Sequence, residues 1–200
     1  MDENREEYHK CRDWFKQYSA ELIDKVAVFD PSVDGLEVKN AIYRINRNNR
    51  FNKDLPPYKD YFAITVSKGG KKSVFSEYYF HLSPFNQSCI GIGKWGPDSD
   101  SLAKIRQEID YNPEPLKEFI RSNFFRENFS GLYNHGKLKK APRGYSVDHE
   151  NIELLKLKHF SVFKNFTDKE ICKEDFTDKM IHLFTESKPL VDYLNDALVV

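Results

Sequence analysis

The sequence predicts a single α+β domain in which a mixed or antiparallel central sheet carries N- and C-terminal helices packed on it. Two observations lead to this fold class: strand-like segments follow one another in the middle of the chain, and segments with helical periodicity stand at both ends. The length of 200 residues fits one domain, or at most two small ones. Because no repeat, low-complexity tract or Gly/Ser linker interrupts the chain, we expect one domain over residues 1–200.

The first element is predicted to be a helix over residues 4–28. Apolar and aromatic residues recur there at spacings of three and four, which is the period of one helix face. This face consists of Tyr8, Cys11, Phe15, Tyr18, Leu22 and Val26. Asp30-Pro31 ends the helix, because the residue before a proline is displaced from the α region.

Four β-strands are predicted to follow, since four segments are rich in β-branched or aromatic residues. They cover residues 38–45, 61–66, 75–82 and 89–95. The connections between the last three are short and turn-like, which favours antiparallel neighbours. We expect these strands to share one sheet that buries Ile42, Phe62, Ile64, Phe80 and Ile92.

The second half of the chain is predicted to be mainly helical. Helices are expected over residues 99–110 and 113–122, and Asp148 is expected to cap a short helix that ends near residue 156. Residues 159–166 alternate like a strand, and Thr167 and Glu170 have the spacing of a capping box. Two helices over residues 175–186 and 189–198 close the chain.

Composition excludes several classes of function. The 31 Lys and Arg residues balance the 31 Asp and Glu residues, so no overall charge attracts nucleic acid or an anionic membrane. No apolar run approaches the roughly 20 residues of a membrane span, and the N-terminus is too acidic for a secretory signal. Three scattered cysteines, Cys11, Cys89 and Cys172, form no disulfide framework. We therefore expect a cytoplasmic protein with no membrane partner.

The motifs of the common enzyme classes are missing. There is no phosphate-binding loop, no complete dinucleotide-binding pattern, no zinc motif and no nucleophile elbow. The six histidines are scattered without metal-ligand spacing. We expect no metal and no cofactor, whereas a catalytic site assembled from distant residues stays open.

A basic segment over residues 41–59 is the strongest indication of a ligand. It contains one acidic residue, Asp54, and five basic ones, Arg44, Arg47, Arg50, Lys53 and Lys59. Five cations so close together repel one another unless something negative lies between them. Tyr58 follows two prolines, which stiffen the segment and lower the entropy lost when an anion binds.

Arg44 has two possible roles. On the predicted strand it shares a face with Val38 and Ile42, where a guanidinium needs an opposite charge. That charge is either an internal carboxylate, such as Asp110 or Glu108, or a bound anion.

A second basic segment, residues 137–145, contains four cations and no acid: Lys137, Lys139, Lys140 and Arg143. Charge runs of this kind usually solvate a loop. If both basic segments lie on the same rim of the sheet, they form one anion-attracting cleft.

Two strands offer further chemistry. Gly91 and Gly93 alternate along one strand and leave a bare surface, which a ligand or another backbone can approach closely. The preceding strand places His81 and Tyr79 on one face. One hairpin register puts the glycine face beside His81 and forms a polar pocket, while the other forms ordinary core. His81 is the candidate proton shuttle, because the unperturbed pKa of histidine lies near neutrality.

The basic segment resembles the signature of domain-of-unknown-function family 2461, a conserved hypothetical family of bacteria and fungi. The matching positions are Arg44, Arg47, Arg50, Phe51, Lys53, Asp54, Pro57, Tyr58 and Lys59. Residues 78–82, 91–95, 105–106, 138–145 and 148–149 resemble later motifs of the family in the same order, so that the resemblance covers about residues 4–163. Glu7 stands where the family usually has Trp. The resemblance implies a single cytoplasmic α+β domain without an established activity.

The sequence supports two functional hypotheses, and a purely structural role is the third alternative. In the first, a small phosphate- or carboxylate-bearing ligand binds to Arg44, Arg47 and Lys53, with Tyr58 and Arg106 in support and His81 as catalyst if the protein is an enzyme. The other candidate ligand-binding residues are Arg50, Lys59, Lys139 and Arg143. In the second, the two basic segments dock nucleic acid or an acidic protein without catalysis. Because the net charge is zero, any nucleic-acid binding is expected to be weak.

Overall fold

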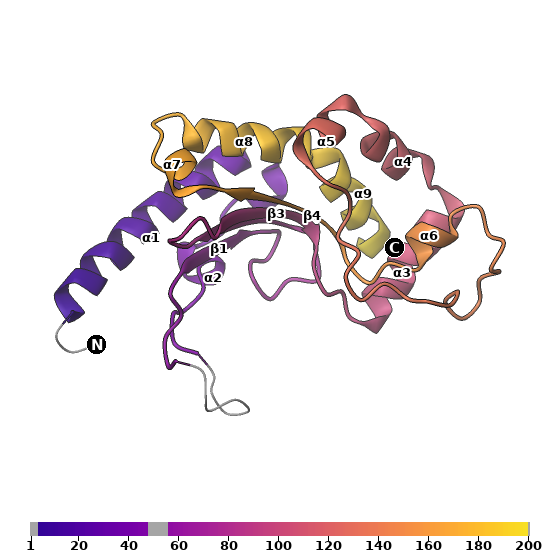
Figure 1. Ribbon diagram of the computed structural model, residues 1–200, viewed down its shortest axis with the longest axis horizontal. Helices are drawn as coiled ribbons and strands as arrows, with labels where there is room; N and C mark the ends of the chain where they lie inside the picture. Colours follow the sequence, from indigo (N-terminus) through magenta and orange to yellow (C-terminus); the bar gives the residue numbers. More distant parts are fainter. Residues whose placement is uncertain (1–3, 48–55, 200) are drawn as a thin grey trace. The chain divides into compact units, whose positions relative to one another are not determined.

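The computed structural model describes residues 4–47 and 56–199. Within them the chain has the predicted α+β fold, with one four-stranded antiparallel sheet and helices before β1, between β3 and β4 and after β4 (Figure 1). The strand order is β1-β2-β3-β4. The strands are β1 (Phe62–Val66), β2 (Glu77–Leu82), β3 (Ser88–Lys94) and β4 (Phe160–Phe166).

The chain forms two compact units, each built from separate stretches of sequence. Unit 1 comprises Met1–Ser73, Tyr79–Cys89 and Asn165–Ile181. Unit 2 comprises Val74–Tyr78, Ile90–Lys164 and His182–Val200.

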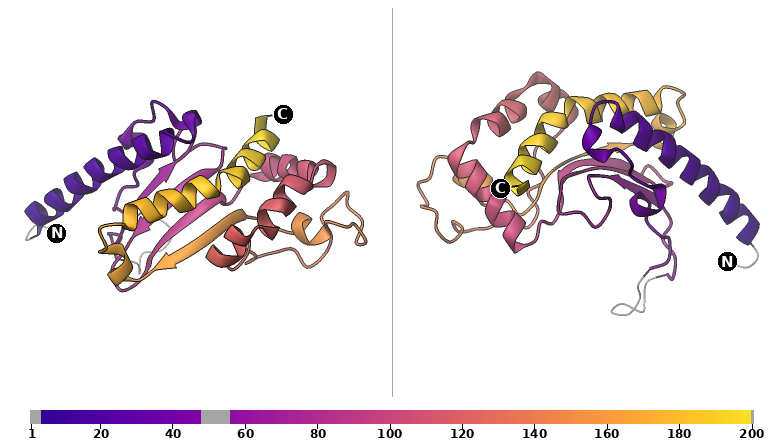
Figure 2. Two further views of the ribbon diagram at one scale, coloured as in Figure 1. Left: turned by 90° about the horizontal axis from the view of Figure 1, so that it is seen from above. Right: turned by 180° about the vertical axis from the view of Figure 1, so that it is seen from behind.

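In unit 1 the long helix α1 (Arg5–Ala27) confirms the first predicted element. It lies against β1 and the short helix α2 (Val38–Ala41), as Figure 2 shows from two sides. Phe15, Leu22 and Val26 of the predicted face are buried, and Phe15 stacks on Phe62 with ring centroids 5.1 Å apart. After α1 the chain turns through the 3-10 helix η1 (Pro31–Val33), which Asp30 caps by accepting from the backbone N–H of Ser32.

The prediction of a strand over residues 38–45 is wrong. The first half of this segment is the helical turn α2, and its second half forms only one isolated bridge, between Ile42 and Ile64. The helical turn shifts the alternation of the chain, so that Ile45 is buried and Arg44 is exposed. The prediction that Arg44 lies on a core face is therefore also wrong.

Unit 2 contains most of the helices. They are α3 (Ser99–Tyr111), α4 (Glu114–Arg121), α5 (Asn123–Asn128), α6 (Ile152–Leu155) and α9 (Lys188–Val199), while α8 (Phe176–Glu186) contributes to both units. α9 lies beside α3 and α4 (Figure 1). Asp98 caps α3, accepting from the backbone N–H of Ser101 at 2.8 Å. The predicted helical character of residues 99–122 is confirmed.

Two predicted caps have different outcomes. The capping box before α7 (Asp168–Ile171) is confirmed, because the hydroxyl of Thr167 accepts from the Glu170 backbone while the Glu170 carboxylate accepts from the Thr167 backbone. Asp148, by contrast, does not cap α6. That helix begins after Asn151, whose N–H donates to Nδ1 of His149 at 3.0 Å.

Of the five predicted core residues, Ile64, Phe80 and Ile92 are buried. Ile42 and Phe62 are only half-buried. Both line a cleft in unit 1, which is described below.

The alternate glycines of β3 are covered by β4. A Cβ at Gly91 would lie 2.7 Å from the Phe163 ring, and a Cβ at Gly93 would overlap the carbonyl oxygen of Phe160. Gly93 also has φ +114°, a conformation that L side chains rarely adopt. Close approach by another backbone, one of the two expectations for these glycines, is therefore observed at Gly93, whereas a side chain covers Gly91.

Gly93→Ala is expected to lower the free energy of unfolding by about 2–5 kcal/mol, since it combines backbone strain with overpacking against Phe160. Gly131→Ala is the control, because Gly131 also has a positive φ, +134°, but a Cβ there meets nothing within 4 Å. Urea unfolding of both variants measures the difference. Equal losses for the two substitutions would contradict the packing argument.

Candidate functional site

Unit 1 contains a cleft of about 470 Å³ whose described lining has five cations and no acidic side chain. We call it the basic cleft. Its cations are Arg12, Lys16, Lys39, Arg44 and Lys71. Aromatic rings of Tyr8, Phe15, Tyr43 and Phe62 form much of the remaining lining.

Two of the cations come from α1. Arg12 and Lys16 are four residues apart and therefore lie on the same side of the helix. Both contact Asp13, with Lys16 Nζ at 3.0 Å and Arg12 Nε at 3.7 Å from Oδ1. The hydrogen bond from Lys16 is the main cause that lowers the pKa of Asp13. Asp13 itself does not line the cleft, whereas both cations do.

Lys71 is held by the backbone at the end of α2. Its Nζ donates to the carbonyl oxygens of Lys39 and Ile42, both at 2.8 Å. An ammonium has three N–H donors, so one remains for another acceptor. Gly70 makes this position possible, because it has φ +77° and a Cβ there would lie 2.6 Å from the carbonyl oxygen of Asn40.

Arg44 lines the basic cleft with an exposed side chain. Within residues 4–47 and 56–199 no carboxylate forms an ion pair with it. The internal partners considered from the sequence are bonded elsewhere: Asp110 to His149 at 2.8 Å, and Glu108 to Asn112 at 3.1 Å. The two internal pairs considered for Arg44 are therefore not formed.

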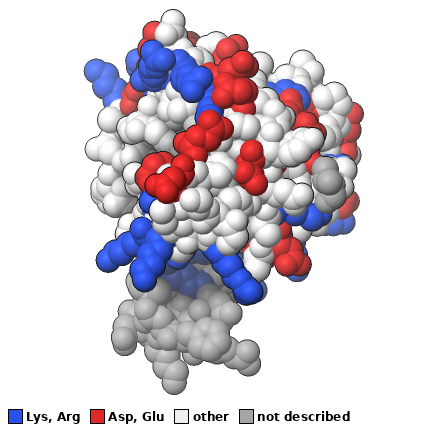
Figure 3. Space-filling view, turned by 90° about the vertical axis from the view of Figure 1, so that its right-hand side faces the viewer, with Lys and Arg blue, Asp and Glu red and all other residues white. Residues whose placement is uncertain are grey.

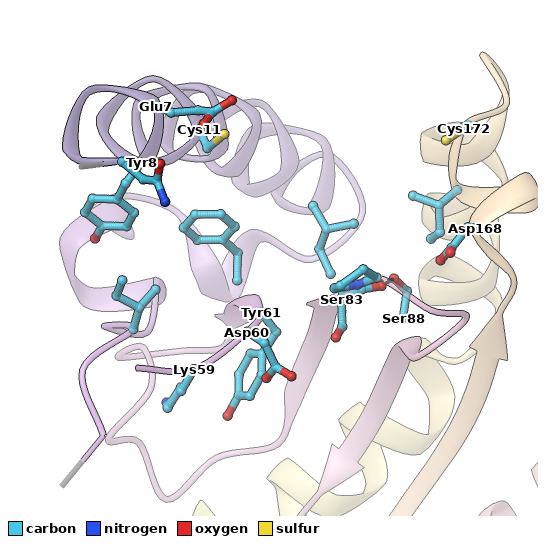
Figure 4. A pocket seen from close by; sticks show the side chains of 16 residues that line it. Glu7, Tyr8, Cys11, Lys59, Asp60, Tyr61, Ser83, Ser88, Asp168 and Cys172 are labelled. Carbon is cyan, nitrogen blue, oxygen red and sulfur yellow. Dashed lines mark hydrogen bonds between the residues drawn. The ribbon is translucent and has the colours of Figure 1, made fainter. Parts of the chain in front are cut away.

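A second cleft of about 580 Å³ lies in the same unit, and we call it the large cleft (Figure 4). Glu7, Tyr8 and Cys11 face it from α1, and Lys59, Asp60 and Tyr61 come from the segment before β1 (Figure 4). The hairpin turn between β2 and β3 and the helix α7 contribute the remaining wall.

The hairpin turn at this wall is held in a strained conformation. Phe85 and Asn86 both have left-handed backbones, with φ 63° and 58°. Their two N–H groups donate to the carboxylate of Asp168 at 3.1 and 2.9 Å, and the Asn86 side chain accepts from the Asp168 N–H at 2.8 Å. This reciprocal bonding fixes the turn to the start of α7.

His81 is half-buried between two tyrosines. The Tyr61 ring lies 4.1 Å from it, and the Tyr79 hydroxyl is 3.1 Å from Nδ1. Burial is the main cause that lowers the pKa of His81, while Asp60 acts in the opposite direction. His81 lines neither described cleft, although Tyr61 lines the large one.

Three predicted ligand residues meet in one short strand pair. Asn46 and Tyr58 form a bridge, and Arg47 Nε donates to the Tyr58 carbonyl at 3.1 Å. A nitrogen of Arg47 also lies 3.5 Å from Asp60. The Lys59 ammonium lies over the rings of Tyr43 and Tyr61, 5.6 and 5.2 Å from their centroids, and Lys59 lines the large cleft. Arg50 and Lys53 lie outside the described residues.

The remaining predicted site residues belong to unit 2. Arg106 donates from Nε to the Leu155 carbonyl at 2.8 Å and from a terminal nitrogen to the Leu157 carbonyl at 3.2 Å. These bonds brace the chain after α6, and burial lowers the pKa of Arg106. Lys139 and Arg143 are exposed on the second basic segment.

The sequence analysis missed four of the five cations in the basic cleft: Arg12, Lys16, Lys39 and Lys71. The spacing of Arg12 and Lys16 with Tyr8 and Phe15 was a usable signal, because these positions share one side of a helix. The position of Lys71 depends on how its turn meets α2, which no local pattern reveals.

The chain matches the family described as conserved hypothetical protein (DUF2461) over residues 1–193 and belongs to it. The family description names no activity. No curated protein and no solved structure matches the chain.

Neither a metal-binding cluster nor a bilayer-spanning helix occurs within residues 4–47 and 56–199. No group of three His, Cys, Asp or Glu side chains is arranged to hold a metal ion. None of the described helices combines the length and apolarity that a bilayer-spanning helix needs.

His81→Gln is expected to reduce the dependence of stability on pH between about pH 7.5 and 5. Because the folded protein lowers the pKa of His81, the unfolded chain binds more protons as the pH falls through about 6.5, and stability is lost there. The variant lacks this contribution, although His159, whose pKa burial also lowers, leaves a remaining slope. Urea unfolding at several pH values measures it. His9→Gln, on the exposed side of α1, is the control, and an unchanged slope in His81→Gln would contradict the argument.

Proposed function

We propose that the protein binds a small anion that carries a phosphate or carboxylate group, and that this group occupies the basic cleft. The observation that supports the proposal is the described lining of that cleft, which has five cations and no acidic side chain. Asp13 contacts Arg12 and Lys16, and Glu37 contacts Lys39 at 2.9 Å. These carboxylates do not line the cleft, so a bound anion would add attraction to the cations on the cleft side. A guanidinium and an ammonium also supply the charge-assisted hydrogen bonds that phosphate and carboxylate groups prefer.

Arg44 and Lys71 are the central residues of this proposal. Arg44 has a planar fork of donors suited to two oxygens of one anion. Lys71 is fixed by two backbone carbonyls, so that little side-chain entropy is lost when its third N–H binds a ligand. The proposal places the protein in the cytoplasm, because Cys11, Cys89 and Cys172 are all free thiols.

Arg44→Met is expected to weaken phosphate binding about tenfold, which corresponds to about 1.4 kcal/mol, the magnitude of a hydrogen bond to a charged group. The free energy of unfolding is expected to change by less than about 0.5 kcal/mol, because the side chain is exposed. Isothermal titration with phosphate and with acetate, at constant ionic strength, measures binding.

The matched control is Arg121→Met. Arg121 is an exposed arginine in unit 2 that pairs with Glu114 and lines neither cleft, so its loss should leave phosphate binding unchanged. If wild type binds neither phosphate nor acetate, the proposal is overturned. A large destabilisation by Arg44→Met would assign Arg44 to the scaffold instead.

A second candidate function is docking of single-stranded nucleic acid on unit 2, and one observation favours it. Trp95 is 44% exposed and stacks on His159 with centroids 4.2 Å apart. The edge of Tyr133 supports the same ring. Exposed aromatic rings stack on nucleic-acid bases, and the second basic segment with exposed Lys139 and Arg143 lies in the same unit. On the face drawn in Figure 3, acidic side chains lie among the basic ones, so we expect weak binding with a shallow salt slope.

Fluorescence quenching tests this candidate, because the chain has 2 tryptophans and Trp14→Phe leaves Trp95 alone. An oligothymidine is expected to quench Trp95. Replacing Trp95 with Ala in the wild-type background should weaken binding of a labelled oligothymidine about 5- to 150-fold, the range of about 1–3 kcal/mol for one stacked base. A DNA duplex, whose bases are already stacked, is the control ligand. No quenching by the single strand would remove this candidate.

A further inference from the structure

The basic cleft and the large cleft share a wall. Tyr8, Ile45 and Phe62 line both of them, so a ligand that fills one cleft lies next to the other. Phe62 is half-buried although the sequence predicts it in the core, because its ring stands between two concave surfaces. The two clefts therefore adjoin each other along these three residues and differ in their chemistry.

The large cleft offers apolar surface. Leu82 and Ile171 are half-buried and line it together with Pro84. Its buried polar groups are already satisfied, since the hydroxyl of Ser88 accepts from the Ser83 N–H at 3.0 Å and donates to the Ser83 carbonyl at 2.8 Å. A volume of about 580 Å³ is within the range of small-molecule pockets, and apolar surface left in such a concave place favours an apolar ligand group.

The charges that line the two clefts determine where an acidic ligand group binds. Glu7, Asp60 and Asp168 line the large cleft, and carboxylates repel an acidic group. The only cation among the described residues of that lining, Lys59, has its ammonium over two aromatic rings. The basic cleft has the opposite balance. An acidic group is therefore attracted to one cleft and repelled by the other.

We infer that the ligand is an amphipathic anion, a phosphate or carboxylate on an alkyl chain, with its acidic head group in the basic cleft and its chain in the large cleft. This inference rests on the proposed function for the head group. It adds the class of ligand and the orientation in which the ligand binds.

The test is isothermal titration with inorganic phosphate and with methyl, butyl and octyl phosphate. Affinity is expected to rise about three- to fourfold for each methylene that enters the large cleft, the factor that corresponds to about 0.8 kcal/mol. Arg44→Met is expected to weaken all four ligands by the same factor. The same chain-length gain with alkyl carboxylates would support the inference with a carboxylate head group.

Two variants test whether the alkyl chain of the ligand lies in the large cleft. Ile171→Asn is expected to remove most of the gain from butyl to octyl phosphate while changing the affinity for inorganic phosphate much less, because it adds polarity without charge. Cys11→Asn repeats the test at an exposed position of the same cleft, where a folding defect is not expected. Val147→Asn, at an apolar residue that is 70% exposed in unit 2, is the matched control and should bind all ligands as wild type does.

The proposed function and the inferred ligand class predict different outcomes of these titrations. If inorganic phosphate and all alkyl phosphates bind equally well, the inference is overturned and the proposed function stands. If none of the ligands binds, both fall. Octyl phosphate that binds with chain-length gain but without sensitivity to Arg44→Met would overturn the orientation of the head group.

Discussion

The bond between Lys71 and the end of α2 is the constraint on which the candidate site depends. Helix C-termini carry unsatisfied carbonyls, and the ammonium of Lys71 satisfies two carbonyl groups there, those of Lys39 and Ile42. The bond ties the turn after β1 to the point where the chain leaves α2, and only a residue without Cβ fits at position 70. From that point the chain runs extended along the edge of β1, which places Arg44 at the basic cleft.

The sequence predicted most of the regular elements correctly, because their signals are local. The helix period in α1, the capping box of α7 and the β-branched and aromatic runs of β1 to β4 need no knowledge of the rest of the chain. The strand prediction for residues 38–45 was wrong because their β-branched composition favours a strand. The bond from Lys71, 26 residues beyond the segment, favours a helical turn instead. The prediction of the basic cleft was incomplete for a similar reason. Arg44 could be identified from its neighbours in sequence, but Lys71 and Arg12 join it only through tertiary packing.

The net charge of zero gives no indication of the basic cleft. The 31 basic and 31 acidic residues cancel over the whole chain, yet the described lining of one cleft has five cations without an acid, while the adjoining cleft has three carboxylates. The strong fields lie within a Debye length of each cleft, about 8 Å at physiological ionic strength, so they act on a bound ligand and not on a distant polyanion. Local separation of charge therefore favours a small ligand as the main partner, whereas composition alone only excluded a strong attraction to nucleic acid.

Catalysis at the proposed site would place a geometric requirement on His81. A general acid or base must reach the ligand within hydrogen-bond distance or through one water. His81, the strongest candidate from the sequence, is separated from the large cleft by the Tyr61 ring and is bonded to the Tyr79 hydroxyl. The described residues that line the basic cleft include no histidine, carboxylate, thiol or hydroxymethyl group. An anion bound there as proposed would meet cations that hold it and aromatic rings that exclude water.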